Sequence, residues 1–224
     1  MILTENLTKY FKDLKAVDNV NLHVKAGEVL ALLGPNGAGK TTTVRLLTTV
    51  LKPSSGTARV ATYDVLENPS QVRSSVGVLT EDHGLYDRMH IEEYLDFFGQ
   101  IYDMPADERE KRIQYLLGRF GLLDARNRRI GKFSKGMMQR LGLAQAIIHD
   151  PRLLILDEPT SGLDFAASFD YLERVQKLAA QGHNILIVTH HLNEIPPEID
   201  RIILLRDGRI AADQTELAAE GPLA

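Results

Sequence analysis

The sequence predicts an α/β domain with a mostly parallel core sheet, an antiparallel β flank and an inserted helical subdomain. Short apolar runs at residues 29–33, 153–156 and 185–188 are bounded by turn signals, which is typical of parallel strands buried on both faces. Between residue 91 and about residue 146, apolar side chains instead recur every three or four positions, which indicates amphipathic helices. The helical stretch is therefore expected to interrupt the α/β core.

The remaining elements follow from local patterns taken in chain order. Before the helical stretch we expect short strands at residues 2–7, 16–24, 27–33, 57–61 and 76–79. An antiparallel flank beside the core sheet is the simplest arrangement of these strands. After Asp164 we expect a helix at 165–180, strands at 185–188 and 202–205, and a turn at Asp207 and Gly208.

Length and composition indicate one ordinary globular domain of 224 residues, with 44% hydrophobic and 25% charged side chains. We expect residues 1–90 and 147–224 to form the α/β core and residues 91–146 the helical subdomain. A net charge of -4 and a sequence pI near 6.0 argue against a nucleic-acid partner, which would need a basic surface. The chain has no cysteine, which excludes disulfides and thiolate chemistry.

The sequence is expected to carry neither a secretion signal nor a membrane-spanning segment. The first residues lack the basic-then-apolar order of a signal peptide, so a cytoplasmic location is expected. The longest apolar runs are far shorter than the ~20 residues needed to span a bilayer. A role at the membrane is therefore expected to depend on a partner.

A phosphate-binding loop is the most specific single motif. Residues 34–41 match the pattern G-x-x-x-x-G-K-[ST] at every fixed position, directly after an apolar run. Its glycines let backbone N–H groups point at phosphate oxygens, and the helix expected to begin near Lys40 adds its positive N-terminal dipole. Lys40 is expected to neutralise the β and γ phosphates, and Thr41 to ligate Mg²⁺. The chain is thus predicted to be a P-loop NTPase, with its nucleotide bound by Gly34, Pro35, Asn36, Gly37, Ala38, Gly39, Lys40, Thr41 and Thr42.

Two carboxylates, Asp157 and Glu158, directly follow the apolar run at residues 153–156. This end of a buried strand is where α/β sheets place their ligand chemistry. Asp157 is suited to hold Mg²⁺ through water. Glu158 is suited to orient, or to accept a proton from, a water that attacks the γ-phosphate. A solvated strand end before a Pro159 turn is the alternative, which the phosphate loop upstream disfavours.

The order of these and later motifs resembles the ATP-binding-cassette (ABC) family over nearly the whole chain. Residues 133–139, Phe-Ser-Lys-Gly-Met-Met-Gln, are similar to the family signature, usually Leu-Ser-Gly-Gly-Gln. Residues 161–164, Ser-Gly-Leu-Asp, are similar to the D-loop, and Thr189 with His190 ends a strand as the family's switch histidine does. The set of motifs is far more specific than the phosphate loop alone.

The resemblance implies a head-to-tail homodimer or heterodimer that binds ATP with Mg²⁺ in two shared sites. Ser134 and Gly136 of one subunit would touch the γ-phosphate held by Lys40 of the other. Asp164 would link the two sites, and His190 would be a catalytic residue that contacts the γ-phosphate. From the residues alone Ser134 is a helix N-cap, and the two roles are compatible.

Two site positions depart from the family pattern or carry an open alternative. Glu81 stands where the family has a glutamine that touches Mg²⁺ and the attacking water. It is expected to act as a metal ligand, with a solvated loop acid as the alternative. Phe11 falls where the family stacks an aromatic ring on adenine, with a plain packing role as the alternative.

The predicted function is an ATPase subunit that drives a separate transmembrane permease from the cytoplasmic face. Glu81 and the Gly84-Leu85-Tyr86 segment resemble the corresponding residues in ATPase subunits of exporters that serve drugs, lipids, polysaccharides or sodium. An importer ATPase is the runner-up. A soluble ABC protein of translation or DNA repair is the alternative from another class. The presence of one cassette without long coiled coils argues against it. Ser134 and His190 likewise argue against a P-loop kinase or a small GTPase.

Overall fold

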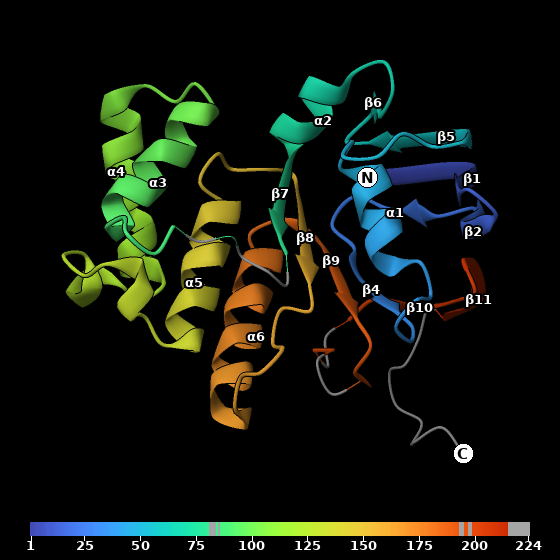
Figure 1. Ribbon diagram of the computed structural model, residues 1–224. Helices are drawn as coiled ribbons and strands as arrows, with labels where there is room; N and C mark the ends of the chain where they lie inside the picture. Colours follow the sequence, from blue (N-terminus) through green and yellow to red (C-terminus); the bar gives the residue numbers. More distant parts are fainter. Residues whose placement is uncertain (81–83, 85, 193–194, 197–198, 215–224) are drawn as a thin grey trace.

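A six-stranded sheet forms the centre of the structure (Figure 1). This computed structural model describes residues 1–80, 84, 86–192, 195–196 and 199–214. The strand order is β11-β10-β4-β9-β8-β7, in which the five strands from β10 to β7 are parallel and β11 is antiparallel to β10. These strands are β4 (Val29–Leu33), β7 (Val76–Leu79), β8 (Leu153–Asp157), β9 (Asn184–Thr189), β10 (Arg201–Arg206) and β11 (Arg209–Gln214). Every residue of β8 and β9 is buried, as the apolar runs predict.

The antiparallel flank is confirmed as a second sheet of order β2-β1-β5-β6, with β3 also paired to β1. Its strands are β1 (Ile2–Phe11), β2 (Leu14–Val20), β3 (His23–Val24), β5 (Ser55–Val60) and β6 (Tyr63–Asp64). Two expected boundaries are wrong. β1 runs on to Phe11 because it pairs with β2 as far as Leu14, and the strand expected at 16–24 is two separate strands.

Helices lie on both faces of the central sheet. They are α1 (Lys40–Leu47), α2 (Pro69–Ser75), α3 (Ile91–Ile101), α4 (Ala106–Arg119), α5 (Lys135–Ala146) and α6 (Phe165–Ala179), with short 3-10 turns at Leu123–Ala125 and Ile130–Lys132. Figure 1 shows α5 and α6 beside the sheet, α3 and α4 farther out, and α1 on the side of the antiparallel flank. Three helices thus occupy the stretch from 91 to 146, and the division into subdomains at its two ends stays a prediction.

Among the elements that were not predicted from the sequence are α2 and β11. The helix α2 contains one buried residue, Val72, and so has no apolar stripe. The strand β11 has no fully buried residue and continues β10 through the turn at Asp207 and Gly208. Both elements depend on neighbours in space more than on their own apolar pattern.

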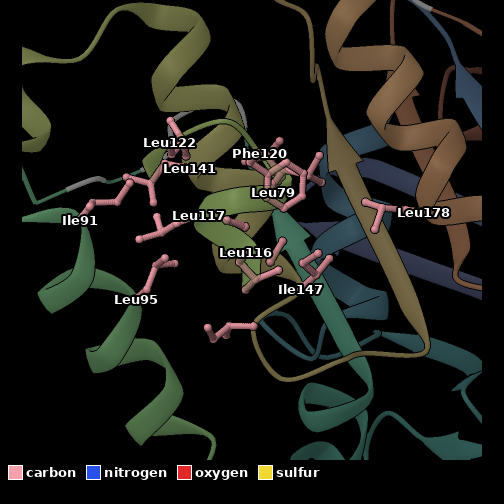
Figure 2. Packing of buried hydrophobic residues seen from close by; sticks show 14 of the residues in the cluster. Leu79, Ile91, Leu95, Leu116, Leu117, Phe120, Leu122, Leu141, Ile147 and Leu178 are labelled. Carbon is pink, nitrogen blue, oxygen red and sulfur yellow. The ribbon is translucent and has the colours of Figure 1, made fainter. Parts of the chain in front are cut away.

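One apolar cluster joins the helical layer to the sheet (Figure 2). It includes Leu95 of α3, Leu116 of α4 and Leu178 of α6, each 0% exposed. Complete burial of one such side chain stabilises the fold by about 1.5–3 kcal/mol. At the junction with β7, a Cβ on Gly77 would lie 1.9 Å from the Ala146 carbonyl oxygen, so only glycine allows α5 to approach this closely.

The strands that carry the site residues are adjacent in the sheet. β9 lies between β4 and β8, and all three are parallel. Their carboxyl ends therefore meet at one edge, where the phosphate loop, Asp157 and Thr189 lie together. Across the described residues, no helix combines the length and apolar character needed to cross a membrane.

Candidate active site

The phosphate loop lies between β4 and α1, in the strand–loop–helix order that was predicted. Gly37 and Gly39 adopt φ values of +82° and +102°, which L side chains rarely adopt. A Cβ on Gly39 would also lie 2.4 Å from the Ala16 carbonyl oxygen, so the loop is pressed against β2. Because Gly39 is the N-cap of α1 and has no side chain to cap it, the first amides of the helix remain available for an anion.

A cavity of about 440 Å³ opens over this loop. Its walls come from β1 and β2, the phosphate loop, the end of β8 and the β10–β11 turn. The residues are Phe11, Leu14, Lys15, Ala16, Asn36, Gly37, Ala38, Gly39, Lys40, Thr41, Thr42, Asp157, Glu158, Asp207 and Gly208. Most of the predicted nucleotide-binding residues are thus brought together, and the predicted Phe11 lies in the same lining.

The β10–β11 turn was not predicted to belong to this site. The N–H of Gly208 donates to the Ala38 carbonyl oxygen over 3.0 Å, which ties the turn to the phosphate loop. Arg209 also binds the buried Asp18 carboxylate of β2 at 2.6 Å. Hydrogen bonding from Lys15, supported by Arg209, lowers the pKa of Asp18, so this link stays charged well into the acidic range.

Lys40 is buried, at 6% exposed. Its Nζ donates to the carbonyl oxygens of Gly34 at 2.6 Å and Pro35 at 3.2 Å. The same atom lies 4.0 Å from Glu158 Oε1. Gly34 and Pro35 therefore support the lysine through their backbone. A Cβ on Gly34 would lie 2.3 Å from the Leu205 carbonyl oxygen, so a side chain at this position would clash with the backbone of β10.

Glu158 is held by three successive residues at the end of β9. Its N–H donates to the Val188 carbonyl oxygen over 2.8 Å, and its backbone has a φ of +49°. The carboxylate accepts a hydrogen bond from Thr189 Oγ1 at 3.0 Å and lies 2.7 Å from His190 Nδ1. The structure thus brings the side chains of Lys40, Glu158 and His190 together. Thr189 was not predicted as a site residue, although it directly precedes His190.

Oxygen donors lie where Mg²⁺ was predicted. Thr41 and Asp157 both line the cavity over the phosphate loop, and Asp157 is 8% exposed. A hydroxyl and a carboxylate are ligands that Mg²⁺ accepts, and the ion completes its shell with phosphate oxygens and water. The donor set therefore fits the ion. The third predicted ligand, Glu81, lies outside the described residues.

The signature and D-loop residues lie on a different surface. Ser134, Gly136 and Asp164 line a cavity of about 420 Å³, which shares no described residue with the lining of the first. Ser134 caps α5 by accepting from the Met137 N–H at 3.3 Å, and Asp164 caps α6 by accepting from Ala167 at 2.8 Å. The N-cap prediction is confirmed, and the structure does not bring these residues to Lys40 within one chain.

Comparisons with known proteins agree with this geometry. Residues 17–161 match the family model described as ABC transporter. The chain is 40% identical to the ABC transporter ATP-binding protein NatA of Bacillus subtilis, over 94% of this chain and 87% of that protein. It is 37% identical to the daunorubicin resistance ATP-binding protein DrrA3 of Streptomyces coeruleorubidus, over 98% of this chain and 70% of that protein.

Solved structures give the same result. An ATP-binding subunit of an ABC transporter matches with a TM-score of 0.86 and 31% identity, covering 96% of this chain and 90% of that one. The dimeric bacterial ABC transporter cassette MJ0796 matches with a TM-score of 0.87 and 26% identity, covering 96% and 98%. The chain therefore belongs to the ABC transporter family, in which it is an ATP-binding and ATP-hydrolysing subunit.

Proposed function

We propose that this subunit works as a head-to-tail dimer that drives a separate transmembrane permease in the direction of export. The observation that carries the proposal is the separation of two half-sites: Lys40 and Glu158 line one cavity, and Ser134 and Gly136 line another. Each subunit would offer one half to its partner, in a homodimer or a heterodimer. The chain would then lie at the cytoplasmic face and reach the bilayer through the permease.

Within each composite site, we assign roles by chemistry. Lys40 and the amides of the phosphate loop would bind the phosphates, while Phe11 would stack on the adenine. Glu158 would accept a proton from the attacking water, and His190 would contact the γ-phosphate. Thr41 and Asp157 would hold Mg²⁺, which would offset the phosphate charge, and Glu81 stays a predicted third ligand.

The direction of transport is inferred from the relatives. The one from Streptomyces coeruleorubidus is named for daunorubicin resistance. Removal of a drug from the cell is a direct route to such resistance, so the name supports export.

The dimer is tested by Ser134→Arg. The larger side chain would overfill the surface that faces the partner, and overpacking costs about 1–3 kcal/mol, which raises the dissociation constant roughly 5- to 150-fold. We expect the variant to bind ATP as a monomer with unchanged affinity, and to dimerise and hydrolyse ATP about tenfold less well. Analytical ultracentrifugation with MgATP measures the dimer. Normal hydrolysis by Ser134→Arg monomers would limit this residue to its role as a helix cap.

An aromatic patch offers a docking surface for the permease. It consists of the aromatic residues Tyr86 and Phe97 together with the aliphatic Ile101, which are 51%, 40% and 55% exposed. The rings of Tyr86 and Phe97 meet edge to face at 6.0 Å. Tyr86 follows β7 in the sequence, and β7 pairs with β8, the strand that carries Asp157. Exposed aromatic side chains are enriched at protein interfaces, which supports this surface as the contact.

Docking is tested by Phe97→Asp in the tagged full chain. A buried aromatic at an interface contributes about 2 kcal/mol, so a roughly thirtyfold loss of permease binding is expected. The measurement is the recovery of a membrane-spanning protein from detergent-solubilised membranes, together with stimulation of ATPase activity by that protein in vesicles. Tyr115→Asp is the matched control, since this half-exposed ring of α4 contacts Arg112 and Arg119 instead. Equal recovery with both variants would exclude the aromatic patch as the docking surface.

A further inference from the structure

The two carboxylate oxygens of Glu158 have different partners. Oε1 lies 2.7 Å from His190 Nδ1 and 4.0 Å from Lys40 Nζ. Oε2 accepts a hydrogen bond from Thr189 Oγ1 at 3.0 Å. The carboxylate is therefore held from one side by two ionisable groups and from the other side by a neutral hydroxyl.

The partners of Oε1 are the ones that a bound nucleotide would compete for. A γ-phosphate attracts the Lys40 ammonium, and His190, an exposed residue, can turn towards the same charge. Lys40 Nζ no longer restrains Glu158 once it bonds to the phosphate, and the same holds for His190 if its ring turns so that Nδ1 leaves Glu158 Oε1. Glu158, which is proposed to act on water, would then lose the restraint on its Oε1 at the moment when its orientation matters.

Thr189 has no such freedom. It is 0% exposed, and β9 lies between two parallel neighbours, β4 and β8. Its Oγ1 accepts a hydrogen bond from the His191 N–H at 3.1 Å. A hydroxyl has a single proton, and with the amide occupying one acceptor position, that proton is directed at Glu158 Oε2.

We propose that Thr189 is the positioning residue for Glu158, and that its hydroxyl keeps the carboxylate aligned while Lys40 and His190 engage the nucleotide. The proposal rests on the role of Glu158 as the base. It also explains why a polar side chain ends a strand that is otherwise buried and apolar from Ile185 to Val188. As a positioning residue, Thr189 would act through Glu158 and not on the phosphate or the water directly.

The test compares Thr189→Val, which removes the hydroxyl and keeps the shape, with Thr189→Ser, which keeps the hydroxyl. Misplacement of a catalytic group by about 1 Å lowers a rate roughly a hundredfold, so we expect kcat of Thr189→Val to fall by ten- to a hundredfold. Its KM and its ATP dissociation constant should change less than about threefold, and Thr189→Ser should retain kcat within about threefold. All assays are run below the thermal midpoint of every variant.

Thr160→Val is the matched control. Thr160 is 3% exposed and lies two positions after Glu158, and its Oγ1 has no hydrogen-bond partner among the described residues. The same loss of a buried hydroxyl should here leave kcat within about threefold. The bound nucleotide provides a second measurement: after incubation with MgATP, Thr189→Val should retain ATP where the wild type holds ADP.

Three results would overturn the proposal. The first is a kcat for Thr189→Val equal to that of Thr160→Val. The second is a failure of Thr189→Ser to retain kcat, and the third is a Thr189→Val defect confined to nucleotide affinity. If Glu158 were not the base, a different result would show it, because Glu158→Gln would then turn over ATP within a fewfold of the wild type. If Glu158→Gln is inactive and Thr189→Val is normal, only the positioning role of Thr189 is excluded.

Discussion

Glu158→Gln is expected to abolish steady-state ATP hydrolysis while MgATP still binds. A positioned general base contributes roughly 10²–10⁴-fold to a rate, and an amide cannot accept the proton. The substitution keeps the size of the side chain. The hydrogen bond from the backbone N–H of residue 158 to the Val188 carbonyl oxygen is also retained, because it does not involve the side chain. The protein should therefore fold, bind ATP and accumulate in the ATP-bound state.

The measurement is phosphate release at saturating MgATP, with ATP affinity measured by calorimetry on the same preparation. Glu173→Gln is the matched control, because this carboxylate lies on α6 and pairs with Lys177. The control should hydrolyse ATP at the wild-type rate. Turnover of Glu158→Gln within a fewfold of the wild type would remove Glu158 from catalysis and leave it as a buried partner of His190 and Thr189.

Lys40→Ala is expected to weaken nucleotide binding itself. Hydrogen bonds to charged groups contribute about 1.5–3 kcal/mol, so the dissociation constant for ATP should rise by one to two orders of magnitude. Lys40 is 6% exposed and its ammonium already bonds to two loop carbonyls, so it is held over the cavity before ATP arrives. Little ordering of this side chain remains to oppose binding.

Calorimetric titration with ATP in the presence of Mg²⁺ checks this expectation. Lys177→Ala is a suitable control, since it removes an exposed lysine that pairs with Glu173 on α6. An affinity of Lys40→Ala equal to that of the control would contradict the assignment of the phosphate loop. Together with Glu158→Gln, the variant separates binding from turnover.

Patterns within single segments were sufficient to predict the parallel and antiparallel sheets and most of the candidate site. The five parallel strands and the antiparallel flank follow from apolar runs and turn signals, because burial on both faces requires such runs. Lys40 was identified within the phosphate-loop motif and Glu158 at the end of a buried strand, whereas His190 was identified through the resemblance to the ABC family. In contrast, α2 and β11 carry almost no buried residues of their own, so their sequences hold no comparable signal.

By itself, the sequence determined the fold class, the phosphate loop and the residue types available for phosphate and metal chemistry. These properties depend on short contiguous stretches, where spacing alone decides which groups lie together. Only the tertiary structure decided that Thr189 holds Glu158 and that the Gly208 turn lines the nucleotide cavity. The first contact depends on the order β4-β9-β8 and the second on the pairing of β10 with β4 and β11, because a hydrogen bond between residues 31 or more positions apart exists only once the sheet has formed.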